Sequence, residues 1–188
     1  MMYKCFGVRN TGILILITLV LKLTIATGHA ALIASADISS CDGSDISGKV
    51  FFVELPSEQG VKVVLVSAWT QGLSPGQHAV HVHETANCTP CSAANGHFDP
   101  GPHANPNPDA NHPFHSGDLV NMKVGATGIG ILRTATSRLT LSPGPLSIND
   151  NDGSALIIHV DPDTYCPNGD VAGCAGGGRA ACGIITLN

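Results

Sequence analysis

The chain has 188 residues, with 14 acidic and 9 basic side chains and a formal net charge of −5 at pH 7. A chain of this length has room for one domain with a sizeable core. The excess of acidic side chains argues against nucleic acid or an anionic membrane surface as a partner. Nine histidines and seven cysteines are the unusual part of the composition.

Residues 1–30 have the pattern of a secretory signal peptide, with two basic side chains, a mostly apolar run over 12–25 and then small residues. The alternative is an uncleaved membrane anchor. It is disfavoured because the apolar run is shorter than the ~20 residues of a spanning helix and Lys22 interrupts it. Cleavage would leave one secreted, extracellular domain over 31–188, with six basic and fourteen acidic residues and a formal charge of −8.

Eight short apolar or alternating segments follow, rich in Val, Ile and Thr and separated by Gly, Pro, Asn, Asp and Ser. This pattern is typical of β-strands joined by turns. The predicted strands span 31–38, 49–55, 61–69, 78–84, 119–124, 128–134, 155–160 and 183–187. Short strands at this density predict an all-β sandwich or barrel. The two long intervals, 85–118 and 161–181, are predicted to be functional loops.

A histidine pair, His81-Val82-His83, lies in the fourth predicted strand. Side chains two residues apart on a strand point to the same face, so both imidazoles can reach one metal ion. Such a pair alone is weak evidence, but imidazole is a common ligand of copper and zinc, and further histidines follow. His78, at an odd spacing from His81, is expected to face the other way and to be structural.

The first long loop carries further metal-binding side chains, namely His97, His103, His112, His115 and Asp118. Three imidazoles and one carboxylate complete a tetrahedral zinc shell. The compact turn from His115 to Asp118 can supply two of these four ligands. The alternative is a polar loop with incidental histidines, which the prolines of this loop disfavour because they stiffen it in advance.

His159 ends an apolar strand, where a histidine bonded within the core is the ordinary expectation. Asp161 and Asp163 follow closely. A carboxylate beside a metal-bound imidazole commonly accepts its second N–H and fixes its orientation. We predict this role for Asp163.

Cys5 lies in the leader, and six cysteines behind a signal peptide predict disulfides. The alternative is thiolate metal binding, with Cys88-x-x-Cys91 as half of a zinc site. The sequence contains no second pair of this kind, which disfavours that reading.

Five motifs together resemble the copper/zinc superoxide dismutase family. They are GQHAVHVHE, NGHFDP, HSGDLVN, GSALIIHVDPD and GGRAACGII, in the order in which the family has them. The resemblance runs from about 38 to 187. It implies an all-β, eight-stranded Greek-key β-sandwich or flattened barrel with two long functional loops.

The resemblance implies one copper and one zinc ion per subunit. The copper ligands would be His81, His83, His97 and His159. His97 would bridge the two ions as an imidazolate. Arg179 resembles the family's arginine beside copper, a fixed cation that holds superoxide within hydrogen-bond range. The alternative for Arg179 is a structural salt bridge.

The zinc ligands implied by the resemblance are His97, His115, Asp118 and one further histidine between them. The loop is spaced differently from that of the family, which leaves two choices. His103 is our choice, since Pro106 follows it as in the family pattern. His112 is the alternative, and otherwise it would stand outside the site.

The resemblance also implies an intrasubunit disulfide between Cys91 and Cys182, which would fix the metal loop to the last strand. Proximity in the sequence then suggests the two remaining pairs, Cys166–Cys174 and Cys41–Cys88.

The implied activity is that of a secreted superoxide dismutase, in which copper cycles between two oxidation states as superoxide becomes oxygen and hydrogen peroxide. His97 would carry a proton to the departing peroxide. The second loop lacks the lysine and glutamates with which the family steers the anion, so we expect slower association. The family often dimerises, which leaves a homodimer open. The alternatives are a copper-buffering protein on the same fold, which would need no Arg179, and a sandwich with structural zinc alone, which would need no His81 or His83.

Overall fold

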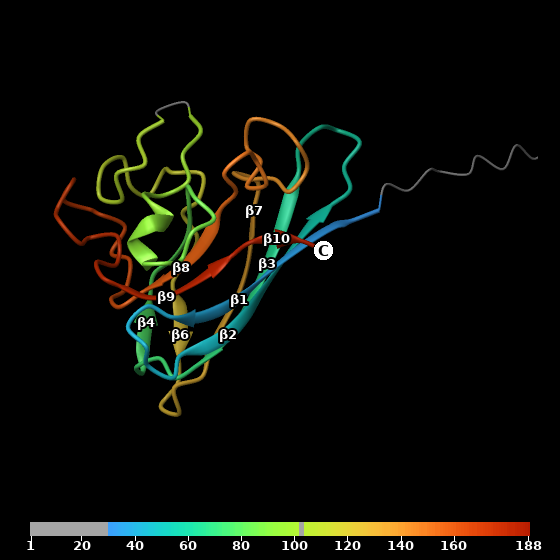
Figure 1. Ribbon diagram of the computed structural model, residues 1–188. Helices are drawn as coiled ribbons and strands as arrows, with labels where there is room; N and C mark the ends of the chain where they lie inside the picture. The colour runs from blue at the N-terminus through green and yellow to red at the C-terminus, as the bar shows by residue number, and fades with distance from the viewer. Residues whose placement is uncertain (1–29, 102–103) are drawn as a thin grey trace, which may run out of the picture.

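The computed structural model describes residues 30–101 and 104–188 (Figure 1). The predicted signal peptide, apart from its last residue, and the expected zinc ligand His103 lie outside the described residues. The described chain forms ten strands and one 3-10 helix. These are β1 (Leu32–Ser40), β2 (Ser47–Leu55), β3 (Val63–Gln71), β4 (Gly76–His78), β5 (Val80–His83), η1 (Cys91–Ala94), β6 (Met122–Val124), β7 (Gly130–Thr136), β8 (Ala155–His159), β9 (Arg179–Ile184) and β10 (Thr186–Leu187). Within these ranges, no helix is long and apolar enough to cross a membrane.

Strand β3 illustrates why these segments form a sheet. Val64, Val66 and Ala68 are buried, while Leu65 and Trp69 on the opposite face are exposed. Only an extended strand, with its period of two, sorts these side chains between core and solvent. Strands β1 and β2 alternate in the same way, and their inward side chains join the same core.

The sheet closes on itself through one short segment of chain. Its strand order is β4-β6-β7-β3-β2-β1-β9-β8-β5. Strands β4 and β5 stand at opposite ends of this order, yet only Ala79 separates them in the sequence. The segment 76–83 therefore pairs with β6 through its first half and with β8 through its second. Strand β7 returns to pair with β3 on the far side from β6, which is a Greek-key arrangement. The prediction of an all-β Greek-key fold is confirmed.

Six of the eight predicted strands match the observed ones to within three residues at each end, and the other two differ more. The strand predicted over 78–84 is divided because Ala79 leaves the regular ladder and donates its N–H to the Asp161 carbonyl over 3.0 Å. The strand predicted over 183–187 begins four residues earlier, at Arg179. Arg179 is followed by the small residues Ala180 and Ala181, and the segment is extended because Ala181 and Cys182 pair with β8.

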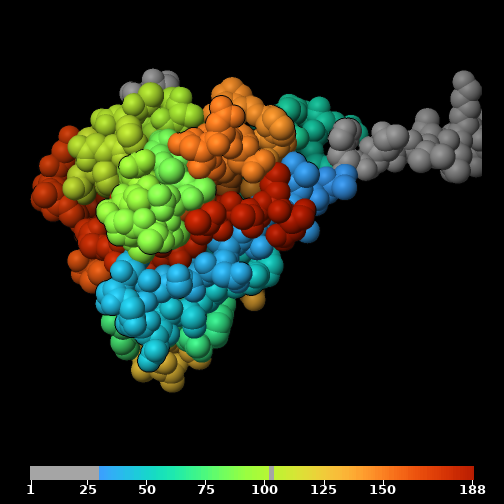
Figure 2. Space-filling view, in the orientation of Figure 1, coloured from blue at the N-terminus to red at the C-terminus, as the bar shows by residue number. Residues whose placement is uncertain are grey.

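The two long loops gather on one side of the barrel, near β8 (Figure 1), with which β5 pairs. Every residue of these two strands is buried, whereas burial alternates along β1, β2, β3 and β7. Figure 2 shows the green and yellow-green first loop in contact with the red second loop on this side of the molecule. The loops therefore cover the outer face of β5 and β8, and this covered layer is where the candidate ligands lie.

Three disulfides join the six cysteines of the described domain. Cys166–Cys174 is present, as expected. The other two bonds are Cys41–Cys91 and Cys88–Cys182. The expected pairings Cys91–Cys182 and Cys41–Cys88 are therefore wrong.

The location of the 3-10 helix explains this exchange of partners. Strands β1 and β9 are neighbours, with Ser39 opposite Cys182, so Cys41 and Cys182 lie close together. Cys41, Cys88, Cys91 and Cys182 belong to one apolar cluster. Either loop cysteine, Cys88 or Cys91, is therefore close to both Cys41 and Cys182. Cys91 begins η1 and lies against Cys41 at the end of β1. Cys88, the other loop cysteine, is then left to pair with Cys182 of β9. Spacing in the sequence does not distinguish these two pairings.

Candidate metal centre

Strand β5 presents two histidines on its outer face. Val80 and Val82 point into the barrel core, so His81 and His83 point away from it, as the alternation predicts. His159, at the end of the neighbouring strand β8, lies on the same side, with its Nε2 3.2 Å from Nδ1 of His81. All three histidines are buried.

The first loop lies directly over β5. Val82 N donates to Gly117 O over 2.9 Å, and Phe98 N donates to Val82 O over 2.9 Å. Glycine is required at this point because a Cβ on Gly117 would lie 2.2 Å from Val82 O. The close approach places His97 and Asp118, the sequence neighbours of Phe98 and Gly117, against the β5 histidines.

Four imidazoles meet in a first cluster, which consists of His81, His83, His97 and His159. One nitrogen of each ring lies within 4.8 Å of the others. The ring centroids of His81 and His97 are 4.1 Å apart, and those of His83 and His97 are 4.9 Å apart. Nε2 of His83 and Nε2 of His97 are buried and have no hydrogen-bond partner among the described residues. Buried nitrogens without partners that converge on one point fit a metal ion.

The second nitrogen of each ring fixes its orientation. Nδ1 of His83 donates to the Asn95 carbonyl over 2.8 Å, and Nδ1 of His159 donates to a carbonyl of the second loop over 3.1 Å. Nε2 of His81 lies 3.2 Å from Oδ2 of Asp163. These bonds leave Nδ1 of His81, and Nε2 of His83 and His159, directed into the cluster.

A second cluster consists of His97, His112, His115 and Asp118. Oδ1 of Asp118 lies 2.7 Å from Nδ1 of His97. Its Oδ2 lies 3.0 Å from Nδ1 of His115 and 3.1 Å from Nδ1 of His112. One ligand atom of each of the four residues lies within 4.8 Å of the others, and three imidazoles with one carboxylate are a ligand set that suits zinc.

His112 occupies the position that the sequence left open between two histidines. It was the alternative to His103, and His103 lies outside the described residues. His112 is buried within the second cluster and does not stand outside the site. His78 does stand outside both clusters, where it bonds through Nδ1 to the His159 carbonyl over 2.8 Å.

Asp163 joins the two clusters. Its Oδ2 lies 3.2 Å from Nε2 of His81 and 2.7 Å from Nε2 of His112. The Asn121 side chain holds the Asp163 backbone, accepting from its N–H over 2.8 Å and donating to its carbonyl over 2.9 Å. The outer carboxylate expected from the sequence is therefore close to the ligands, but it contacts one ring of each cluster and not His159.

Burial lowers the pKa of the imidazoles in the first cluster. The pKa of His97 and that of His159 fall to about 3, and the pKa of His83 lies well below its usual range. Loss of water around the ring is the largest cause in each case. Neutral imidazole is the form that binds metal, so these three rings are in their ligand form at neutral pH.

The carboxylates have the opposite effect in the second cluster. Burial alone would lower the pKa of His112, but hydrogen bonds to Asp118 and Asp163 raise it to about 9. Burial would raise the pKa of the Asp118 carboxyl, but the three surrounding imidazoles hold it far below its usual range. The second cluster therefore holds an ionised carboxylate among its imidazoles, whereas the first is a set of neutral nitrogens.

Arg179 lies beside the first cluster. Its guanidinium donates to the carbonyl of Cys91 over 2.5 Å and to the carbonyl of Asn95. The Asn95 carbonyl also orients His83. Arg179 and His159 border a depression that opens to solvent. A small anion in this depression meets a fixed cation next to the imidazoles.

Two contributors to the site differ from our choices from the sequence, in which His112 was only the alternative to His103 and Asn95 was not considered. His112 forms an evenly spaced run with His115 and Asp118, three residues apart, and this regular spacing was a signal that favoured it. Asn95 acts through its backbone carbonyl and has a φ of 61°. No side-chain pattern reveals such a role.

Comparison with known proteins gives consistent matches. The family model for copper/zinc superoxide dismutase matches residues 46–185. The chain is 35% identical over 162 residues to superoxide dismutase [Cu-Zn] 2 of Brassica juncea, covering 81% of this chain and 95% of that protein. It is 39% identical over 142 residues to superoxide dismutase [Cu-Zn] of Deinococcus radiodurans, covering 69% of this chain and 72% of that protein. The crystal structure of the clock protein EA4 superimposes with a TM-score of 0.64 at 26% identity, over 83% of this chain and 94% of that one.

Proposed function

The chain belongs to the copper/zinc superoxide dismutase family, and on that premise we propose that it converts superoxide to oxygen and hydrogen peroxide at the two histidine clusters. The family comprises oxidoreductases that act on superoxide and use copper and zinc. Membership in a family does not by itself establish turnover, so the proposal rests on the site.

The two nitrogens of His97 are the observation that carries the proposal. Nδ1 lies 2.7 Å from the Asp118 carboxylate, within the second cluster. Nε2 has no hydrogen-bond partner among the described residues, and His97 is also a member of the first cluster. His97 is thus the residue that would serve both of these ligand sets.

We assign copper to His81, His83, His97 and His159, and zinc to His97, His112, His115 and Asp118. Four imidazole nitrogens suit copper, and three imidazoles with a carboxylate suit zinc. When bound, copper supplies the one-electron oxidation and reduction of superoxide, and zinc supplies a fixed positive charge beside His97. His112 thereby takes the place that the sequence had assigned to His103.

The remaining residues bind the anion and move its proton. Arg179 holds superoxide in the depression beside His159, because its guanidinium is fixed by two carbonyls. His97 would hold a proton at Nε2 whenever copper is not bound to that nitrogen, and would pass it to the departing peroxide. Asp163 holds one ring of each cluster, which fixes the positions of the two ligand sets relative to each other.

We also propose that the domain is secreted, after removal of the leader 1–30. All six cysteines of 31–188 are in disulfides, which persist in an oxidising compartment. The test is the N-terminal sequence of the protein recovered outside the cytoplasm. A product that begins near residue 31 is expected, and a product retained in the cytoplasm with its leader would contradict the proposal.

The activity is tested on the purified domain loaded with both metals. One copper and one zinc per chain are expected, together with removal of superoxide. His83→Ala should lose copper and activity, and wild-type activity in this variant would contradict the mechanism. A wild-type protein that holds copper without turnover would instead indicate a copper-buffering protein.

The zinc assignment is tested with two histidine variants of the same loop. His112→Ala should lose zinc, whereas His103→Ala, as the matched control, should retain it. Zinc lost only in the His103 variant would show that the assignment is wrong.

A further inference from the structure

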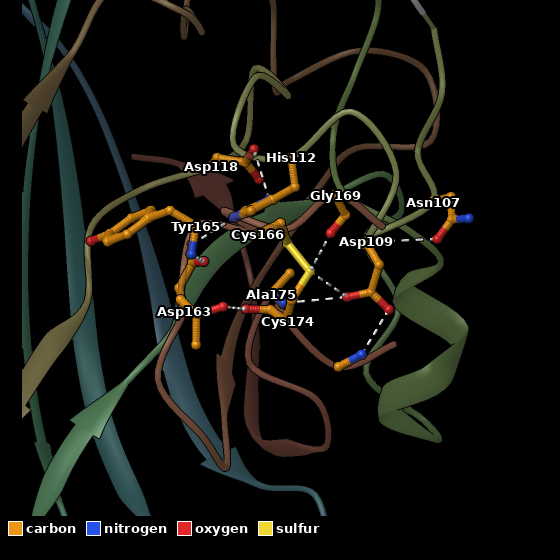
Figure 3. The surroundings of a disulfide bond; sticks show 12 residues. Asn107, Asp109, His112, Asp118, Asp163, Tyr165, Cys166, Gly169, Cys174 and Ala175 are labelled. Atoms are coloured by element: carbon orange, nitrogen blue, oxygen red, sulfur yellow. Dashed lines mark hydrogen bonds and ion pairs between the residues drawn. A yellow bond between two sulfur atoms is a disulfide. The ribbon is translucent and has the colours of Figure 1, made fainter. Parts of the chain in front are cut away.

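Asp109 lies on the rim of the depression beside the first cluster. The depression is lined by His159 and Arg179, and also by Asp109 of the first loop. The Asp109 side chain is half-buried. Figure 3 shows its carboxylate extended toward the second loop. An acidic side chain therefore lies where an anion reaches Arg179.

Two backbone amides of the second loop hold the carboxylate in this position. Oδ2 accepts from Gly173 N over 2.9 Å, and Oδ1 accepts from Ala175 N over 3.3 Å. Sγ of Cys174 lies 3.6 Å from Oδ1, beside the bond to Cys166 (Figure 3). Asp109 and these two cysteines are spaced like a metal site, but both sulfurs are in the disulfide and offer no thiolate. The arrangement fixes the carboxylate and does not bind a metal.

Among the described residues, no ion pair offsets the charge of Asp109. Within 30–101 and 104–188, no lysine, arginine or histidine nitrogen lies within 4.0 Å of its carboxylate. The second loop contains no lysine or arginine between Asp163 and Arg179. An anion in the depression is therefore attracted by Arg179 and repelled by Asp109.

The two opposed charges affect anions differently according to their charge. Coulomb energy is proportional to the charge of the ligand, so a dianion is attracted by Arg179 twice as strongly as a monoanion at the same place. The arginine alone would thus favour dianions over superoxide. A fixed negative charge on the rim reduces that preference, because its repulsion also doubles for a dianion.

We propose that Asp109 is a specificity-determining residue that disfavours doubly charged anions in the depression relative to singly charged ones. This inference rests on the proposed function, in which the anion is superoxide. The factor by which Asp109 weakens binding of a dianion is the square of the factor for a monoanion. Asp109 therefore keeps the site open to superoxide where dianions such as hydrogen phosphate and sulfate are present.

The proposal is tested by anion titration of the copper- and zinc-loaded protein. Azide, a monoanion, is followed by its absorption band with copper, and sulfate, a dianion, by competition with azide at matched low ionic strength. In Asp109→Asn, azide should bind about 2–4-fold more tightly and sulfate about 4–16-fold more tightly, as expected for unit charges several ångströms apart in water. Both gains should shrink near physiological ionic strength, where the Debye length is about 8 Å.

Asp170→Asn is the matched control, because it removes the same charge from the neighbouring second loop, and Asp170 is exposed and does not line the depression. Its effect on sulfate should be much smaller. Hydrogen exchange at the Gly173 and Ala175 amides reports whether the loops have separated. The proposal would be overturned if Asp109→Asn tightened azide and sulfate binding by the same factor, or if Asp170→Asn tightened sulfate binding as much as Asp109→Asn does. If the two factors are equal and amide hydrogen exchange is faster, Asp109 only links the two loops.

Azide binding requires the metal site but no turnover, so the two proposals fail in different ways. A wild-type protein that does not remove superoxide, with the squared relation between the two anions intact, would refute the dismutase function and support the role of Asp109. An active wild-type protein for which Asp109→Asn tightens azide and sulfate binding equally would support the dismutase function and refute the role of Asp109.

Discussion

Gly117→Ala is the smallest change that tests how the first loop is held against β5. The new Cβ would lie 2.2 Å from Val82 O, and real Cβ atoms essentially never lie closer than 3.0 Å, so the loop must move by about 0.8 Å. This movement stretches the bonds from Val82 N to Gly117 O and from Gly117 N to Phe98 O, which are 2.9 and 2.8 Å long. At about 1 kcal/mol for each bond, the metal-free protein should lose about 2 kcal/mol of unfolding free energy. His115 and Asp118 move with the loop, so zinc affinity should fall about 10–100-fold.

The assays are urea unfolding of the metal-free protein and competition for zinc against a chelator. Gly125→Ala is the matched control, because the nearest atom to its Cβ would be Ile129 O at an ordinary 3.8 Å. This control should change the unfolding free energy by less than about 0.5 kcal/mol. If Gly117→Ala matches Gly125→Ala in both assays, the close approach does not hold the zinc ligands and the reasoning is refuted.

Three further predictions concern other parts of the molecule. Asp163→Ala should weaken the binding of both metals by about 10–100-fold in chelator competition, since one of its oxygens holds a ring of each cluster; a loss confined to one metal would contradict this link. Phe52→Ala should lower the unfolding free energy by about 3–5 kcal/mol, because Phe52 is fully buried in the core, whereas a similar loss in Phe51→Ala, on the exposed face, would show that burial is not the cause. Burial would raise the pKa of Glu54, but hydrogen bonds from two backbone N–H groups, one of them that of Leu141, hold it below its usual value of 4.5. The ionised carboxylate therefore stabilises the fold fully above that pH, and this stabilisation is lost as the pH falls below it. The difference in unfolding free energy between wild type and Glu54→Gln should disappear from about pH 5 to pH 3. A difference that does not depend on pH would contradict this.

The barrel follows from local sequence patterns, and its details follow from pairing. The alternation of Val64, Val66 and Ala68 with exposed neighbours is visible in the sequence and is confirmed by the sheet. The break at Ala79 is not visible there, because the hydrogen bond to Asp161 depends on the path of a distant loop. The early start of β9 is hidden for a similar reason, since small residues have little strand preference of their own.

The metal centre, like the barrel, could be predicted from the sequence only where it depends on local geometry. The common face of His81 and His83 depends only on the geometry of one strand, and the sequence predicted it. The placement of His112 in the second cluster and the pairing of Cys91 with Cys41 depend on how a loop of more than thirty residues is folded. A loop of this length places several side chains within reach of the same point, so spacing alone leaves more than one solution.

The closure of the barrel gives the metal ions a second consequence. His81 and His83 lie on the segment 76–83, whose two halves join the ends of the sheet. An ion bound by these two rings and by His159 of β8 would cross-link the paired strands β5 and β8. The contact between these two strands is called the seam below. Opening that seam would require release of the ion, so binding free energy becomes free energy of folding. Proteases that attack the opened seam would remove metal-starved molecules first, and the surviving population would be enriched in loaded protein.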